Sequence, residues 1–150
     1  MKVVIQRVSQ ASVTIAEKIV AHIQHGLLIL VGIEEEDNNE DIDWLVNKII
    51  NLRIFADANH VMNLSVKDIN GDIIVVSQFT LHASTKKGNR PSYLKAAKPE
   101  ISIPMYESFV AELEIALGKK IQTGIFAADM KGSLLNDGPV TIIIDSKNKE

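Results

Sequence analysis

Residues 75–81, with the sequence Val-Val-Ser-Gln-Phe-Thr-Leu, constrain the fold most, because an apolar run becomes polar within one short segment. The run is β-branched and follows a turn signal at residues 70–72, so it predicts a buried strand. Ser77, Gln78 and Thr80 then bring hydrogen-bonding side chains to the end of that strand, where leaving one unpaired costs about 1–3 kcal/mol. Two interpretations stay open: the polar groups cap their own strand, or they form the floor of a site for an anionic substrate.

The remaining patterns predict strands, a helix, strands, a second helix and strands within a single domain of residues 1–150. Short spacings between the early strands indicate an antiparallel meander. The expected fold is mixed α/β, with a curved, barrel-like, mostly antiparallel sheet and two main covering helices. Strands are expected near residues 3–8, 11–15, 19–23, 27–33, 53–55, 61–66, 73–81, 121–126 and 140–145, with 61–66 and 73–81 paired as a hairpin.

Capping signals set the expected limits of the two helices. Asp37 or Asn38 is expected to cap the first helix, which extends to about residue 52. The second is expected to start at Ser102, with Pro104 in its first turn, and to end at Gly118. A brief helical turn is also expected over residues 91–97.

The chain contains no cysteine, which excludes disulfides, thiolate metal sites and a cysteine nucleophile. No apolar run reaches the roughly 18 residues that span a bilayer, and the amino terminus lacks the pattern of a signal peptide. These features fit a cytoplasmic protein. The formal net charge of -3 argues against a protein that coats nucleic acid without specificity.

Charge is nevertheless uneven along the chain. Residues 34–43 contain seven acids and no base, whereas residues 86–98 contain five bases and no acid. A local basic patch on an acidic protein indicates a confined anionic partner, although an ordinary solvated surface has the same composition. The five bases are Lys86, Lys87, Arg90, Lys95 and Lys98.

Common catalytic and cofactor motifs are absent or incomplete. His22 and His25 are three residues apart, which on a strand places them on opposite faces and prevents chelation of one metal ion. Thr80 and His82 would share one face of a straight strand, but no acid is linked to His82 by sequence. The chain has no GxGxxG motif and no P-loop. No metal and no cofactor are therefore predicted.

Residues 136–141 place a Gly-Pro dipeptide directly before a β-branched strand. Gly138 can adopt backbone angles closed to other residues, while Pro139 lacks an N–H and adopts the cis form at modest cost. Such a turn can hold carbonyl oxygens in a fixed direction. A plain tight turn that starts the last strand is the alternative.

Together, residues 77–81 and 136–141 resemble the two signature motifs of the D-aminoacyl-tRNA deacylase family. The resemblance implies a homodimer that hydrolyses the ester between a D-amino acid, or glycine, and the terminal adenosine of tRNA. It implies the tRNA acceptor end and a second copy of the chain as partners, with no DNA, membrane or cofactor. One departure is Ala127, where the family commonly has glycine. Segments 1–8, 53–55, 62–65, 88–92 and 126–130 also resemble the family.

The resemblance implies a role for each site residue. Gly138 and Pro139, joined by a cis bond, would enter the partner subunit's pocket and exclude L-amino acids, and Arg7 would hold their turn through its carbonyls. A 2′-hydroxyl of the RNA would help to activate water. The implied catalytic residues are Ser77, Gln78 and Thr80; the implied substrate-binding residues are Phe79, Gly138, Pro139, Arg7 and Met130; the implied tRNA-binding residues are Lys86, Lys87 and Arg90.

Two other functions remain open. The chain could be a non-catalytic module that binds an RNA end through its basic segment. It could also be a general esterase in which Thr80 is the nucleophile and His82 its base.

Overall fold

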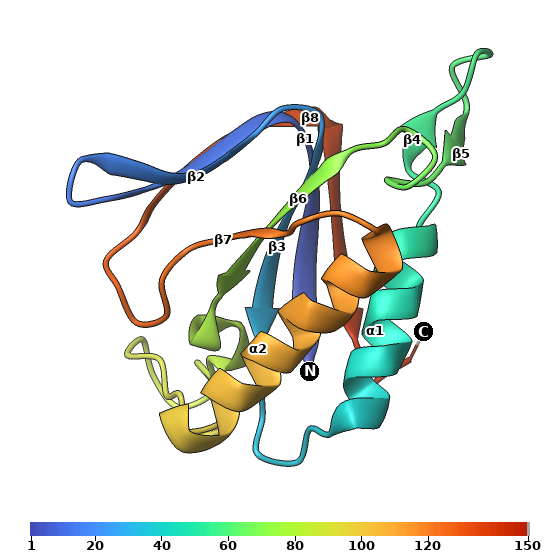
Figure 1. Cartoon of the computed structure of the whole chain (residues 1–150). Coiled ribbons are helices and arrows are strands. Elements are labelled where there is room, and N and C mark those ends of the chain that lie inside the picture. Colours follow the sequence, from blue (N-terminus) through green and yellow to red (C-terminus); the bar gives the residue numbers. More distant parts are fainter. Residues whose placement is uncertain (150) are drawn as a thin grey trace.

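The structure is a computed structural model that describes residues 1–149. Figure 1 shows one curved sheet with two helices packed against one of its faces. The elements are β1 (Lys2–Ile15), β2 (Lys18–Ile23), β3 (Gly26–Gly32), α1 (Asn39–Asn51), β4 (Phe55–Ala56), β5 (Met62–Leu64), β6 (Asp72–Ser77), the 3-10 turn η1 (Phe79–His82), α2 (Pro99–Leu117), β7 (Gln122–Thr123) and β8 (Lys131–Asp145).

The long strand β1 is the centre of the six-stranded sheet. It pairs antiparallel with β2, β3 and β8, while β3, β6 and β7 continue the sheet in parallel. The sheet curls until β2 approaches β7, where the His22 amide donates to Gln122 Oε1 at 3.4 Å. The mixed α/β fold with a barrel-like, mostly antiparallel sheet and two helices is therefore confirmed.

Several strand predictions were wrong. Residues 3–8 and 11–15 form the single strand β1, with irregular pairing to β8 near residues 6–10. The hairpin between residues 61–66 and 73–81 does not form, because β5 pairs with β4 and β6 pairs with β3 and β7. The strand expected at 121–126 is only β7, and β8 begins nine residues before the expected start at residue 140.

The helix predictions hold better for α1 than for α2. Asn38 caps α1 as expected, in a capping box with Asp41. The predicted start of α2 at Ser102 was wrong, since the helix begins at Pro99 and Pro104 lies inside it. Gly118 ends α2 in the left-handed conformation, as predicted. Residues 91–97 form turns and no helix.

The two faces of the sheet differ. Cross-strand neighbours Ile142, Ile5, Ile29 and Val75 form one row toward the main core, which α1 and α2 cover. From α2, the buried Tyr106 hydroxyl donates to the Val75 carbonyl at 2.9 Å. Burial raises the pKa of Tyr106 to about 12, so the phenol stays protonated and ties α2 to β6.

The opposite face carries an apolar row that no helix covers. Its cross-strand neighbours are Val76, Leu30, Val4 and Ile143. Burial falls along this row, from Val76 at 8% exposed to Ile143 at 67% exposed. Uncovered apolar surface of this kind indicates a contact with something outside the chain.

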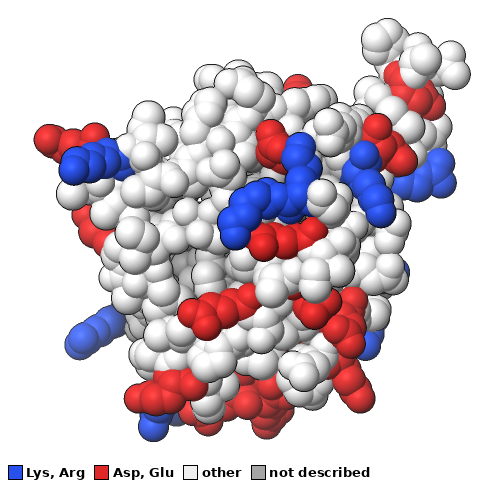
Figure 2. Space-filling view, viewed as in Figure 1, with Lys and Arg blue, Asp and Glu red and all other residues white. Residues whose placement is uncertain are grey.

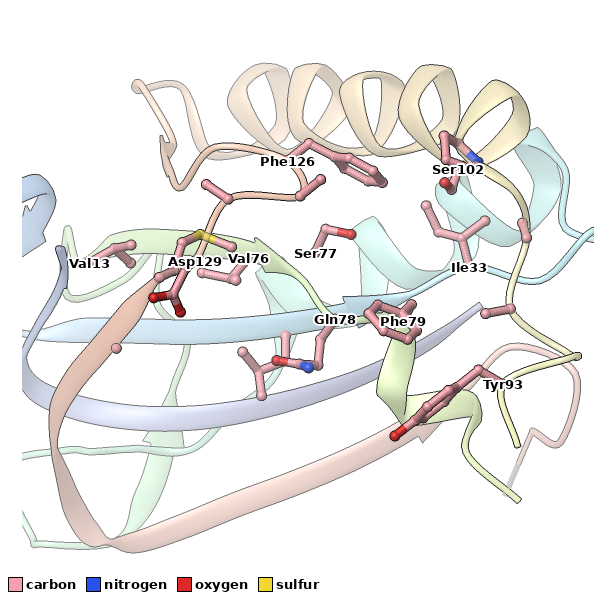
Figure 3. A pocket seen from close by; sticks show the side chains of 18 of the residues that line it. Val13, Ile33, Val76, Ser77, Gln78, Phe79, Tyr93, Ser102, Phe126 and Asp129 are labelled. Atoms are coloured by element: carbon pink, nitrogen blue, oxygen red, sulfur yellow. The ribbon is translucent and has the colours of Figure 1, made fainter. Parts of the chain in front are cut away.

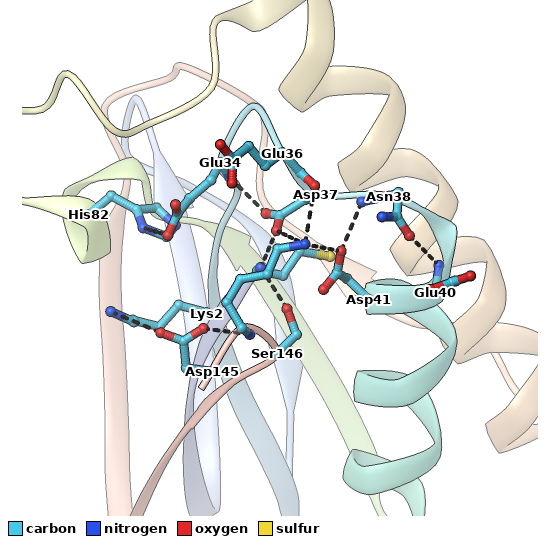
Figure 4. A network of polar contacts seen from close by, with 12 residues as sticks. Lys2, Glu34, Glu36, Asp37, Asn38, Glu40, Asp41, His82, Asp145 and Ser146 are labelled. Atoms are coloured by element: carbon cyan, nitrogen blue, oxygen red, sulfur yellow. Dashed lines mark hydrogen bonds and ion pairs between the residues drawn. The ribbon is translucent and has the colours of Figure 1, made fainter. Parts of the chain in front are cut away.

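A polar network joins the first residue to the end of β8 and the start of α1 (Figure 4). The buried Met1 amino group contacts the Asp37 carboxylate and donates to Ser146 Oγ at 2.8 Å. Asp41 accepts from Lys147 Nζ at 2.8 Å and from the Asn38 amide at 2.9 Å. Because every buried charge in this network has a partner, the helix start is fixed against the sheet. No helix among residues 1–149 is long and apolar enough to cross a membrane.

Candidate active site

The site forms where β6 ends. Val75 and Val76 are buried in the sheet, and the Gln78 amide makes the last strand-like bond, to the Val31 carbonyl at 2.7 Å. The chain then leaves the sheet through η1, which turns Phe79 outward until it is 54% exposed. The polar residues at the strand end therefore face a space beside the sheet instead of the core.

A pocket of about 720 Å³ lies at this strand end. In Figure 3, Ser77, Gln78 and Phe79 form one wall, with Ser102 of α2 and Phe126 of the loop after β7 across from them. Figure 2 shows acidic and basic side chains spread over this face, and Asp129 is the charged residue of the pocket lining. The pocket is lined by Val13, Leu28, Leu30, Ile33, Val76, Ser77, Gln78, Phe79, Tyr93, Ala96, Ala97, Pro99, Ser102, Phe126, Ala127, Ala128, Asp129, Met130 and Gly132.

The lining offers no buried acid or base. Tyr93 and Asp129 are its ionisable residues, and the Asp129 side chain is 86% exposed and paired with Lys131 at 3.0 Å. Thr80 Oγ1 accepts a hydrogen bond from Gln78 Nε2 at 2.6 Å. The arrangement can hold an apolar group beside several amide and hydroxyl groups, but it has no side chain placed to deprotonate a hydroxyl or a water.

His82 is not the base that an esterase using Thr80 would need. The 3-10 turn replaces the straight strand on which the two residues would share a face. The side chain of His82 is instead 1% exposed, and its Nδ1 contacts Glu34 Oε1 at 2.9 Å. Its Nε2 is buried without a partner among the described residues. His82 is therefore the buried last residue of η1, and its imidazole contacts Glu34.

Gly138 and Pro139 do not line the pocket of their own chain. Their bond is cis, and Gly138 has a φ of +136°. Arg7 Nε donates to the carbonyl of Asp137, one residue before the dipeptide, at 2.8 Å, and Nη1 donates to the carbonyl of Ile54. The guanidinium thus anchors the turn to β1 and to the segment before β4.

The other predicted residues divide into two groups. Met130 lines the pocket. Lys86, Lys87 and Arg90 lie outside it, in a loop tip that the two amide–carbonyl bonds between Ser84 and Ser92 close at 2.8 and 2.9 Å. They are exposed and form no ion pair with a described residue.

Sequence reasoning missed several pocket residues outside the motif at residues 77–79. Tyr93, Ser102 and Phe126 come from a loop, a helix and a second loop, and only the fold brings them together. Ala127 has a φ of +62°, which explains why glycine suits this position, and its methyl group lines the pocket. Within residues 1–149, no group of three or more His, Asp or Glu side chains could hold a metal ion.

Comparisons with known proteins agree along the whole chain. The sequence profile of a family described as D-Tyr-tRNA(Tyr) deacylase matches residues 4–145. The D-aminoacyl-tRNA deacylase of Flavobacterium psychrophilum is 81% identical over 150 residues, which cover 100% of both chains. The D-aminoacyl-tRNA deacylase of Bacteroides fragilis is 69% identical, again over 100% of both chains.

Two solved structures resemble the fold. A c-Myc DNA unwinding element binding protein superposes with a TM-score of 0.92 at 39% identity, covering 97% of this chain and 98% of that one. A probable eukaryotic D-amino acid tRNA deacylase superposes with a TM-score of 0.83 at 15% identity, covering 95% and 97%. The second likeness concerns the fold alone.

Proposed function

The chain belongs to the D-Tyr-tRNA(Tyr) deacylase family, and on that premise we propose that it hydrolyses the ester between a D-amino acid and the 3′-terminal ribose of tRNA. The products are free D-amino acid and tRNA, and glycine mischarged on tRNA is a second substrate. One observation carries the proposal: the strand end of β6 presents Ser77, Gln78 and Phe79 to a pocket of about 720 Å³. That volume falls in the range of pockets that enclose a small ligand.

The reaction we propose needs no protein base. An aminoacyl ester is already activated, so positioning and stabilisation of the oxyanion supply much of the rate increase. Backbone N–H groups at the start of η1 have no partner within the turn and serve as the oxyanion donors. The terminal 2′-hydroxyl of the RNA assists the attacking water. The described pocket lining contains no buried ionisable side chain, which supports a mechanism that relies on backbone N–H groups and the RNA 2′-hydroxyl.

We assign chiral selection to the Gly138–Pro139 turn of a partner subunit in a homodimer. The turn lies outside its own pocket, so it acts only on another copy. Thr141 and Ile143 lie on one face of β8, and Ile143 shares that face with the pocket residues Leu30 and Val76, while the Gly-Pro turn lies in the irregular stretch just before Thr141. We therefore propose that the turn and the pocket meet across this uncovered face in a two-fold dimer.

The turn excludes L-amino acids in this scheme because its carbonyl oxygens occupy the space that an L side chain needs. Arg7 holds the backbone just before it, through the Asp137 carbonyl. Recognition through the backbone leaves the D side chain free to vary. We place the reaction in the cytoplasm, where charged tRNA occurs, with Lys86, Lys87 and Arg90 contacting the phosphates of the acceptor end.

Hydrolysis of one tRNA charged in parallel with D- and L-tyrosine tests the proposal. Loss of the D-ester with the L-ester spared is the expected result. Loss of both esters at similar rates points to a general esterase. Loss of neither, with the protein folded, leaves a module that binds an RNA end without catalysis and overturns the proposal.

A further inference from the structure

The first residue of η1, Phe79, and Tyr93 in the loop between η1 and α2 form an aromatic pair that the proposed reaction does not use in full. The rings of Phe79 and Tyr93 lie with centroids 5.0 Å apart at 76°. Phe79 is 54% exposed and Tyr93 is 38% exposed, and the next residue, Leu94, is 95% exposed. Large apolar groups this open at the mouth of a pocket indicate a contact surface for a ligand.

Tyr93 is held in place by backbone bonds on both sides. Before it, the paired amide–carbonyl bonds of Ser84 and Ser92 close the loop tip. After it, the Ala97 amide donates to the Ile33 carbonyl at 2.9 Å. The ring is therefore preorganised beside β3, which lowers the entropy that a ligand would lose by ordering it.

The same loop carries cations that the protein leaves unpaired. No ion pair to a described residue involves any of the five bases in residues 86–98, whereas Lys119, Lys120 and Lys131 each pair with an acid. No acid lies in that segment. Exposed aromatic faces combined with unpaired bases form the binding mode of single-stranded nucleic acids, in which bases stack and phosphates meet cations. The five are Lys86, Lys87, Arg90, Lys95 and Lys98.

The two ends of the pocket differ in their side chains. In Figure 3, Tyr93 lies on the outer side of Phe79, at the end away from Val13 and Asp129. At that opposite end the Asp129 carboxylate is already paired with Lys131 Nζ at 3.0 Å, so this end offers a phosphate no unpaired cation, unlike the basic loop. A strand whose last nucleoside fills the pocket therefore leaves it across the ring pair toward the basic loop.

We infer that Tyr93, supported by Phe79, is the stacking platform for the base that precedes the terminal adenosine of the RNA, and that the basic loop holds the adjoining phosphates. This inference rests on the proposed function and adds a second nucleotide subsite to it. Stacking tolerates any base, so the subsite sets affinity for an RNA end without selecting its sequence.

Two minimal substrates separate this subsite from the reacting centre: a D-aminoacyl ester of adenosine and the same ester on a dinucleotide that adds one 5′ nucleotide. We expect the wild-type enzyme to favour the dinucleotide by about tenfold in kcat/KM, mostly through KM. Tyr93→Ala should remove that preference, so its loss of kcat/KM on the dinucleotide ester should exceed its loss on the adenosine ester by about tenfold, while Tyr93→Phe should restore the preference. Ile115→Ala, on an exposed apolar residue of α2, is the matched control and should change neither.

A persistent dinucleotide preference in Tyr93→Ala, or an equal loss on both esters, would overturn the inference. If the wild-type enzyme hydrolyses neither ester, the proposed function fails. Whether Tyr93 forms a nucleotide subsite is then tested separately, by RNA binding. For that case, fluorescence anisotropy with an uncharged single-stranded RNA oligonucleotide should show about tenfold weaker binding by Tyr93→Ala than by the wild type. Equal dissociation constants would reject the platform.

Discussion

At the scale of single residues, Thr80 distinguishes the proposed mechanism, which uses no protein base, from an esterase in which Thr80 is the nucleophile. Its hydroxyl accepts from Gln78 and has no base beside it, while His82 is committed to Glu34. We expect Thr80→Ala to keep at least about a tenth of kcat, because an unassisted hydroxyl is a poor nucleophile. Single-turnover hydrolysis of D-tyrosyl-tRNA measures this. A folded variant with no turnover would instead make Thr80 the nucleophile.

Gly138 combines an unusual backbone angle with close packing. Its φ is +136°, and an added Cβ would lie 2.7 Å from Val140 Cγ2 and 3.0 Å from Arg7 Nη2. We expect Gly138→Ala to lower the free energy of unfolding by about 1–3 kcal/mol and to reduce discrimination between D- and L-esters. Urea unfolding and parallel hydrolysis of the two esters measure both effects.

Gly132 is the matched control for that variant. It also lies in β8, but a Cβ there would meet nothing within 4 Å and its φ is not positive. Gly132→Ala should change stability by less than about 0.5 kcal/mol, and because Gly132 lines the pocket, any change in KM should be the same for the D- and L-esters and leave their ratio intact. Equal effects of the two substitutions would mean that the Gly-Pro turn has no special role.

Ala127 holds the left-handed conformation at the pocket wall. Ala127→Gly should raise the free energy of unfolding by about 1 kcal/mol, because glycine adopts this conformation without a steric penalty. Ala16→Gly, in the β1–β2 turn with a φ of +46°, should stabilise similarly. Only the Ala127 variant should alter KM. If both variants alter KM equally, the methyl group of Ala127 does not shape the site.

Of the predicted site residues, those that line the pocket are Ser77, Gln78 and Phe79, from one continuous motif, and Met130. Ser77, Gln78 and Phe79 are adjacent in sequence, so local order along the chain is enough to bring them together. Tyr93, Ser102 and Phe126 belong to segments whose approach depends on how α2 crosses the sheet, which local patterns do not encode. The 3-10 turn that contains Thr80 and His82 was also not predicted, because residues 73–81 were expected to form one straight strand.

At the scale of elements, α1 depends on the charge state of Asp41. Burial of this carboxyl raises its pKa, but hydrogen bonds from Lys147, Ser146 and the Asn38 amide outweigh that effect and lower the pKa to about 2. A folded pKa below the unfolded value near 3.8 contributes stability above about pH 4. That contribution is lost as the pH falls from about 4 to 2.

Asp41→Asn should therefore reduce the free energy of unfolding by about 1–2 kcal/mol at pH 7, and the difference should shrink at pH 2.5. Urea unfolding at the two pH values measures it. Asp43→Asn, an exposed position on the same helix, should have little effect at either pH. A pH-independent loss in the Asp41 variant would assign the effect to packing.

The ends of helices were predictable where a single residue sets them. Asn38 caps α1 through its own oxygen, and Gly118 ends α2 through its backbone freedom. The start of α2 was missed because Lys98, its cap residue, makes no side-chain capping bond. The parallel pairing of β6 with β3 was missed because it joins segments that turn signals do not connect.

At the scale of the whole molecule, the proposed dimer depends on the uncovered face of the sheet. Ile143 is 67% exposed there, in the same row as the pocket residue Leu30. A dimer across this face buries Ile143, and a lysine at that position would bring an unpaired charge into the interface. We therefore expect Ile143→Lys to be monomeric, at 16.5 kDa by light scattering, while the wild type has about twice that mass.

In the proposed dimer the Gly-Pro turn comes from the partner, so the monomeric variant should also lose discrimination between D- and L-tyrosyl-tRNA. Ile115→Lys, at an apolar residue of α2 that is 74% exposed but lies away from the sheet face, should remain dimeric and selective. Both variants add one positive charge, so a difference in their mass or selectivity is caused by the position of the lysine and not by its charge. A monomeric Ile143→Lys that keeps full selectivity would show that each chain builds its filter alone, and the pocket would then need a selective element from its own lining.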